Sequence, residues 1–168
     1  ATTLEDIPML DTPSSSEIHI RAATPGEADA LSALAFRSKA HWGYEPAFLE
    51  ACRPELTITA DQIARAEVYV LEAEGQVIGF YSLSPRVDGE IELSHLFVDP
   101  SHVSRGFGKA LGQHAVETAR ALGHRELIIQ GDPHARAFYR AMGARQVGEI
   151  PSTAWPARML PLFRVALV

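Results

Sequence analysis

The sequence lacks the features that several classes of protein require. Its only cysteine is Cys52, so the chain can form neither a disulfide framework nor a multi-cysteine zinc site. No apolar run approaches the roughly 18 residues of a membrane span. Basic residues are few, with 15 Lys and Arg against 21 Asp and Glu, a net charge of −6. This balance argues against nucleic acid or an anionic membrane as a partner, and it is compatible with an amine substrate.

The remaining composition is that of a globular protein. The chain has 168 residues, of which 46% are hydrophobic and 21% charged, which predicts one domain. Residues 1–16 contain prolines and a serine cluster without periodicity, so we expect a flexible N-terminal tail before a single domain over residues 17–168. The tail has no basic start followed by an apolar core, as a secretory signal would, so a cytoplasmic location is expected.

In the first half, the period of the apolar residues changes from helical to extended. Residues 17–22 alternate as a strand, and the Thr24-Pro25 pair is a helix start signal. An amphipathic helix is predicted from residue 28 to about residue 40, and a second helix over residues 46–52. A third helical segment of a turn or two is predicted over residues 59–66. Alternating residues joined by tight turns then predict an antiparallel meander. Its strands are residues 67–73, 76–84 and 90–98.

The second half alternates between helices and strands. Helices are predicted over residues 106–122 and 133–142, and each ends at a glycine, Gly123 or Gly143. This order implies a mixed sheet with helices on its faces. The remaining strands are predicted over residues 125–130, 144–150 and 162–168, of which the last suits either a core or a homodimer edge.

The clearest chemical signal is a glycine-rich turn between a strand and a helix. Gly106 and Gly108 begin the helix, and Arg105 and Lys109 flank them. A helix N-terminus presents unpaired N–H groups and a partial positive charge, and glycine lets a phosphate approach the backbone closely. The turn therefore indicates an anion site, with a helix start beside two solvated basic residues as the alternative. A P-loop or a dinucleotide fingerprint would need other residues at positions 103, 110 and 111.

Residues 103–108 resemble the pyrophosphate loop of the GNAT N-acetyltransferases, which has the form Gln/Arg-x-x-Gly-x-Gly/Ala. Both glycines match, whereas Val103 occupies the first position. A second family pattern, Asn-x-x-Ala-x-x-x-Tyr followed by a glycine at a helix end, matches at Ala135 and Tyr139, with Asp132 in place of asparagine. The resemblance spans about residues 17–168, and the two motifs are specific together because each lies in the expected strand and helix context.

The resemblance implies an α/β (α+β) domain with the GNAT fold. That fold has a mixed, mostly antiparallel central sheet of about seven strands flanked by about four helices. It also implies acetyl-CoA as co-substrate. We expect no metal, because the histidines lack metal-ligand spacing. The implied cofactor-binding residues are Leu96, Phe97, Val98, Ser104, Arg105, Gly106, Phe107, Gly108, Lys109, Asp132, Ala135, Phe138 and Tyr139.

By the same resemblance, the function is direct transfer of an acetyl group to a primary amine in a ternary complex. Tyr139 is the candidate acid for the departing thiolate, against an aromatic packing role. Glu92 is the candidate base, with Glu90 or a water chain as alternatives. Without a catalytic role, Glu92 would be a solvent-facing residue of the strand. A backbone N–H of Phe97 or Val98 would meet the oxyanion. Strict alternation places His95 opposite Glu92, which favours a structural histidine.

The acceptor is expected to be a small-molecule amine or an amino acid, framed by the region after the first helix and by the last hairpin. Aromatic rings and one carboxylate suit an amine, and an arginine suits a substrate carboxylate. The alternatives are a protein or peptide N-acetyltransferase and a non-catalytic acyl-CoA-binding module. The candidate substrate-binding residues are Trp42, Tyr44, Tyr81, Trp155 and Arg158.

Overall fold

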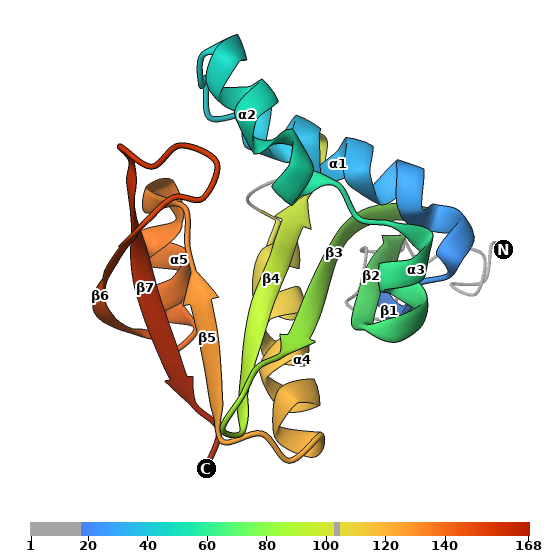
Figure 1. Cartoon of the computed structure of the whole chain (residues 1–168). Coiled ribbons are helices and arrows are strands. Elements are labelled where there is room, and N and C mark those ends of the chain that lie inside the picture. The colour runs from blue at the N-terminus through green and yellow to red at the C-terminus, as the bar shows by residue number, and fades with distance from the viewer. Residues whose placement is uncertain (1–17, 103–104) are drawn as a thin grey trace, which may run out of the picture.

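A computed structural model describes residues 18–102 and 105–168. In these residues seven strands form one mixed sheet, and five α-helices flank it (Figure 1). The tail predicted for residues 1–16 and the loop residues 103 and 104 lie outside the described part. The strands are β1 (Ile18–Ala22), β2 (Glu67–Ala73), β3 (Gln76–Pro85), β4 (Glu90–Val98), β5 (Glu126–Gln130), β6 (Arg145–Pro151) and β7 (Met159–Ala166). The helices are α1 (Ala28–Ala40), α2 (Pro46–Leu56), α3 (Ala60–Arg65), α4 (Phe107–Ala121) and α5 (Arg136–Ala141), with 3-10 turns η3 (Pro25–Glu27), η4 (Pro100–His102) and η5 (Pro133–Ala135).

The five helices agree with the expected fold of a seven-stranded sheet flanked by about four helices. The predicted turn or two is a separate helix, α3, because Thr59 and Gln62 form a reciprocal cap at its start. The Gln62 N–H donates to the Thr59 hydroxyl at 3.1 Å, and the Thr59 N–H donates to the Gln62 side chain at 2.8 Å. Helix α2 runs past its predicted end to Leu56. Pro54 removes only one hydrogen bond in the last turn, and Leu56 is buried there.

The strand order is β1-β2-β3-β4-β5-β7-β6, and β4–β5 is the parallel pair among antiparallel neighbours. That pair is short: it joins Glu90 to Glu126, Ile91 to Leu127 and Glu92 to Ile128. Beyond these residues β4 and β5 separate, as Figure 1 shows. The last strand, β7, lies between β5 and β6, so in the described sheet it is not an edge. The separation of β4 and β5 opens the middle of the sheet at one end.

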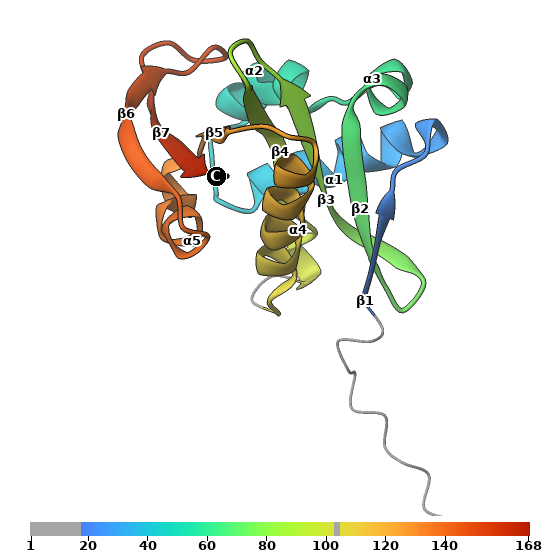
Figure 2. The ribbon, with the colours of Figure 1, turned by 90° about the horizontal axis from the view of Figure 1, so that it is seen from below.

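Two hydrophobic cores cover the two faces of the sheet. Helices α4 and α5 lie on one face and α1, α2 and α3 on the other (Figure 2). The first core contains Leu111 and Ala115 of α4, and the second contains Leu31 and Leu34 of α1. The buried apolar residues of α4 recur at helical spacing and pack on the sheet. The amphipathic pattern of the sequence therefore positions this helix, whose N-terminus lies where β4 and β5 separate.

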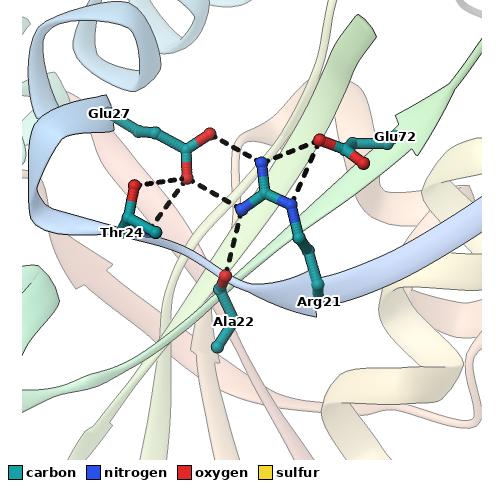
Figure 3. A network of polar contacts seen from close by, with 5 residues as sticks. All are labelled: Arg21, Ala22, Thr24, Glu27 and Glu72. Atoms are coloured by element: carbon teal, nitrogen blue, oxygen red, sulfur yellow. Dashed lines mark hydrogen bonds and ion pairs between the residues drawn. The ribbon is translucent and has the colours of Figure 1, made fainter. Parts of the chain in front are cut away.

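A charge network fixes the first strand to the start of the first helix. Arg21 on β1 donates hydrogen bonds to Glu27 at 2.9 Å and to Glu72 on β2 at 2.8 Å (Figure 3). Glu27 also accepts from the N–H of Thr24 at 2.9 Å, which completes the capping signal seen in the sequence. Arg21 therefore joins β1, β2 and the helical entry into one unit.

Candidate active site

A cavity of about 490 Å³ lies where β4 and β5 diverge. Most of its lining comes from the end of β4, the start of α4, the segment from β5 to α5, and the ends of α1 and α2, and His102 of η4 and Leu160 of β7 complete it. The predicted residues among its lining are Trp42, Leu96, Phe97, Val98, Gly106, Phe107, Gly108, Lys109, Asp132, Ala135, Phe138 and Tyr139. The structure therefore brings together most of the predicted cofactor residues. Ser104 and Val103 lie outside the described residues, and Arg105 does not appear among the lining residues.

The α4 end of the cavity is suited to an anion. Gly106 has a φ of 81°, a conformation that side chains disfavour, and it turns the chain into the helix. No side chain among the described residues caps this 15-residue helix, and its first turn holds no acidic residue. Its first N–H groups and the positive end of its dipole are therefore available to a phosphate. Lys109, which lines the cavity, adds a full positive charge.

Two glycines allow the close packing that shapes the cavity. A Cβ on Gly108 would approach Phe138 of α5 to 3.3 Å. A Cβ on Gly131, just after β5, would lie 2.8 Å from the Tyr139 ring and 3.1 Å from Phe163. Because these rings belong to the buried core, Gly131 is required for the position of Tyr139. Sequence reasoning missed Gly131, since a single glycine after a strand carries no specific signal.

Tyr139 is buried with 9% of its surface exposed, and it also lines the cavity. Burial, and then the negative charge of Asp132, raise its pKa to about 12. The phenol therefore stays protonated at every pH near neutrality, and it can donate a proton or a hydrogen bond to a group in the cavity.

Asp132 is the centre of a polar cluster that we call the Asp132 cluster, consisting of Lys39, Tyr44, Asp132 and Arg158. Its carboxylate accepts from Lys39 Nζ at 2.6 Å, from the Tyr44 hydroxyl at 2.8 Å and from the N–H of His134 at 2.9 Å. Arg158 approaches it to 3.5 Å and donates to the Tyr44 hydroxyl. The cluster joins α1, the loop after it, the start of η5 and the β6–β7 hairpin.

The ionisation of the cluster follows from these contacts. Burial alone would raise the pKa of Asp132, but the charge and the hydrogen bond of Lys39 outweigh it and hold the pKa below its usual value. Burial, followed by the hydrogen bond to Asp132, raises the pKa of Tyr44. The carboxylate is therefore ionised and the phenol neutral across the neutral pH range.

Aromatic rings surround the cations of the cluster. The guanidinium of Arg158 lies 4.6 Å from the ring centroid of Tyr44 and 4.7 Å from that of Phe48. Trp155 in the β6–β7 hairpin contacts Phe48 with centroids 5.8 Å apart, and Trp42 stacks on His134 at 4.9 Å. The structure thus brings Trp42, Tyr44, Trp155 and Arg158 close together around the Asp132 cluster, and of these four Trp42 is among the described lining residues of the cavity.

Tyr81 is placed elsewhere. It is fully buried in the core between the sheet and α4, and its hydroxyl bonds His114 at 2.6 Å and Thr118 at 3.0 Å. Burial raises its pKa. An aromatic residue such as Tyr81 can belong either to a core or to a binding surface. The sequence pattern alone did not distinguish between these two locations. The structure does not support the predicted contact with an acceptor.

A β-bulge corrects the predicted orientation of His95. In the β3–β4 ladder, Glu92 pairs with Ser84 and His95 with Ser82, so three positions on β4 match two on β3. Cross-strand partners share a face, and His95 therefore lies on the same face as Glu92. His95 lines the cavity, whereas Glu92 does not appear among the described lining residues and contacts Arg86 at 3.4 Å.

His95 is nevertheless satisfied by protein partners. Its Nε2 lies 2.8 Å from the backbone oxygen of Glu55, which can only accept, so Nε2 carries the proton. Its Nδ1 then accepts from the Ser82 hydroxyl at 2.6 Å. Burial lowers its pKa, so the ring is neutral near pH 7. The structural role predicted for it fits this geometry, although the reason given by alternation was wrong.

The backbone of β4 provides a donor toward the separation. The N–H of Asp99 donates to Ile78 on β3 at 2.7 Å. Because successive N–H groups of a strand point to opposite sides, the N–H of Val98 points away from β3 and that of Phe97 points toward it. Of the two amides predicted to meet an oxyanion, the geometry favours Val98.

Three further lining residues carry chemistry that the sequence did not assign to the site, namely Lys39, Glu55 and Cys52. They come from α1 and α2, whose juxtaposition with β5 depends on tertiary packing. Burial raises the pKa of Cys52, so it stays a thiol. Among the described residues, no group of three or more His, Cys, Asp or Glu is arranged to hold a metal. In the same part of the chain, no helix has the length and apolarity needed to cross a membrane.

Sequence comparison identifies relatives. The Acetyltransferase (GNAT) family profile matches residues 35–144. Human N-acetyltransferase 8 is 32% identical over 108 residues, which cover 60% of this chain and 47% of that protein. The chain thus spans about half the length of this human relative. Peptidyl-lysine N-acetyltransferase YiaC of Escherichia coli (strain K12) is 31% identical over 128 residues, covering 74% of this chain and 81% of that protein.

Solved structures share the fold. PaiA N-acetyltransferase from Thermoplasma acidophilum, solved in complex with coenzyme A, aligns with a TM-score of 0.73 at 19% identity, over 89% of this chain and 98% of that one. A GNAT family acetyltransferase from Brucella melitensis, in complex with acetyl-CoA, aligns with a TM-score of 0.63 at 22% identity, over 89% and 87%. Because the family match spans more than half of the chain and the fold is shared along most of it, the chain belongs to the GNAT family of N-acetyltransferases, which are acyltransferases.

Proposed function

We propose that the chain is an acetyl-CoA-dependent N-acetyltransferase that transfers an acetyl group directly to a primary amine in a ternary complex. The observation that carries this proposal is one cavity that connects the uncapped start of α4 with Tyr139 and with the Asp132 cluster. An anion cradle, a buried proton donor and an acceptor end thus share one space.

The residues present fit acetyl-CoA. The N–H groups after Gly106 and the charge of Lys109 suit the pyrophosphate, and the free edge of β4 at Leu96 and Val98 suits the amides of the pantetheine arm. When bound, acetyl-CoA supplies an acetyl group activated as a thioester. Structures of two fold neighbours were solved with coenzyme A or acetyl-CoA, which supports the same ligand here.

Two groups of the chain then assist the transfer, one by protonating the leaving thiolate and the other by stabilising the carbonyl oxygen. Tyr139 donates a proton to the departing thiolate, and the N–H of Val98 donates to the carbonyl oxygen as negative charge develops on it. A pKa of about 12 makes Tyr139 a weaker acid than a free phenol. The same dry surroundings also raise the pKa of the thiol that forms from the departing thiolate, so the proton affinities of the phenolate and the thiolate stay similar.

The acceptor amine must lose its proton. A lysine-like amine has a pKa of about 10.4, so reaching the free base at pH 7 costs roughly 4–5 kcal/mol without help from the site. Glu92, on the face of the sheet that carries His95, is the proposed base, through a water chain because it does not line the cavity. A carboxylate that lines the cavity could accept the proton of the amine directly, without a water chain.

We propose a small-molecule amine or an amino acid as the acceptor. A peptide acceptor is the second candidate, and the specific observation in its favour is the Escherichia coli relative, whose name describes a peptidyl-lysine N-acetyltransferase. Incubation with acetyl-CoA and either a lysine-containing peptide or free amines, read by intact mass, separates the two candidates.

Thermal unfolding with coenzyme A, acetyl-CoA, ATP and NAD added separately tests the cofactor. A ligand at 100 times its dissociation constant stabilises the folded state by about 2.7 kcal/mol, a shift of several degrees at this size. We expect a shift with both CoA species and none with ATP or NAD. A shift without release of CoA in the presence of any amine or peptide would instead indicate a non-catalytic acyl-CoA-binding module, and no shift with either CoA species would contradict the proposal.

A further inference from the structure

We propose that the acceptor carries a carboxylate beside an apolar group, and that Lys39 and Arg158 of the Asp132 cluster recognise this carboxylate. The inference rests on the proposed function, and it narrows the acceptor to amino-acid-like amines. It follows from the charge, the hydrogen bonding and the position of the cluster.

The Asp132 cluster contains two cations and one anion. Lys39, Asp132 and Arg158 have side chains that are 15%, 14% and 19% exposed, so solvent screens them little. Tyr44 is neutral, because burial and Asp132 raise its pKa. The cluster therefore has one more positive than negative charge in a partly dry place, where charges are normally paired. Among the described residues, Glu55 also lines the cavity but forms no ion pair with Lys39 or Arg158.

Asp132 is already saturated, so it is not the group that binds a cationic acceptor. Its two oxygens accept from Lys39, from Tyr44 and from the N–H of His134, and Arg158 lies at 3.5 Å. An ammonium group would have to displace one of these donors. The excess charge of the Asp132 cluster itself is positive, and it fits an anionic group of the acceptor.

Arg158 is held ready for such a group. Its guanidinium lies over the rings of Tyr44 and Phe48, and Nη2 donates to the Tyr44 hydroxyl. The described residues offer no hydrogen bond to its Nε or Nη1, and neither atom is a buried unpaired donor. The Nε–H points toward Nη2 and away from Nη1, so each of these two groups can donate a single hydrogen bond to a carboxylate.

The position of the Asp132 cluster also indicates that the acceptor has an apolar group. Lys39, Asp132 and His134 line the same cavity as Tyr139, and Arg158, which is not among the described lining residues, lies behind Asp132 at 3.5 Å. Trp42, which stacks on His134, lines it as well and is 47% exposed. An aromatic face therefore borders the cations, and an acceptor with a carboxylate and an apolar side chain matches both.

Intrinsic fluorescence provides the test, because the chain has only two tryptophans and both, Trp42 and Trp155, lie at this end. The coenzyme A complex is titrated with N-acetyl-L-phenylalanine and, separately, with N-acetylphenethylamine, which lacks only the carboxylate. We expect the carboxylate probe to bind at least about tenfold more tightly. Equal binding of the two probes, or binding of neither, would overturn the inference.

Variants assign the effect to the cluster. Lys39→Met and Arg158→Gln should each weaken the carboxylate probe about tenfold and leave the neutral probe unchanged. Arg65→Gln, which removes an exposed cation paired with Asp61 on α3, is the matched control and should change neither. Equal weakening of both probes would indicate a merely structural role and contradict the inference.

The same samples separate this inference from the proposed function. Stabilisation by coenzyme A without discrimination between the probes overturns only carboxylate recognition. Discrimination between the probes without any effect of coenzyme A overturns the acetyltransferase proposal instead.

Discussion

Tyr139 is the residue on which the proposed proton transfer to the thiolate depends. It belongs to the buried core around α4 and α5, yet it lines the cavity, and its pKa is raised to about 12. Its position depends on Gly131, since any Cβ there would lie 2.8 Å from the ring. The phenol is therefore held rigidly and stays protonated, which is what a proton donor at this point requires.

Tyr139→Phe tests this role at the residue scale. We expect kcat for acetyl transfer to fall by about 10²-fold or more, the size typical of a lost general acid. The affinity for acetyl-CoA, measured by calorimetry, should stay unchanged because the ring is kept. Since the pKa is about 12, the remaining activity should keep the pH profile of the parent between pH 6 and 9. Unchanged kcat would assign Tyr139 to packing.

At the scale of elements, the first strand and the first helix depend on one arginine. Arg21 bonds both Glu27 and Glu72, with side chains 20–30% exposed. The hydrogen bond from Arg21 is the main cause that lowers the pKa of Glu27 to about 2, from 4.5. A lowered carboxyl pKa stabilises the folded state above pH 4.5, and this stabilisation disappears as the pH falls toward 2.

Arg21→Gln should therefore lower the free energy of unfolding by about 1–2 kcal/mol at pH 7, a value reduced for partial solvent screening. The difference from the parent should shrink as the pH falls from 4.5 toward 2, because protonated Glu27 no longer gains from the arginine. Urea unfolding at several pH values measures both. A difference that is constant with pH would show that Arg21 acts through packing rather than through Glu27.

At the scale of the whole molecule, the sheet separates two cores. One contains Ile129 of β5 among residues that pack with α4 and α5, and the other contains Ile63 of α3 among residues that pack with α1 and α2. The cavity lies where the sheet between them opens, so both cores support its walls.

This separation predicts additive energetics. Ile63→Val and Ile129→Val should each cost about 0.5–1.5 kcal/mol of stability, the usual effect of removing one buried methyl group. The double variant should equal the sum within about 0.5 kcal/mol, because the two residues share no core cluster. Chemical denaturation of the three variants checks the sum. A larger deviation would show that the two faces are coupled through the sheet.

The sequence by itself determined most of the elements and the glycine-rich start of α4. Local signals are sufficient there, because the glycines at positions 106 and 108 and the helix they begin are neighbours in the chain, and so are Asp132, Ala135 and Tyr139. The antiparallel meander also followed from alternation and turns. The extent of the third helix was decided by its cap, and the end of the second by the burial of Leu56.

Only the tertiary structure decided how the Asp132 cluster is assembled. Lys39 and Asp132 are 93 residues apart in sequence, yet they are bonded at 2.6 Å, and such a contact leaves no local pattern. The β-bulge that carries His95 to the cavity face breaks the alternation from which its orientation was predicted. Tyr81 has the residue type of a binding surface but is buried by α4. Faces and long-range pairs arise from packing, which the order of residues along the chain does not encode locally.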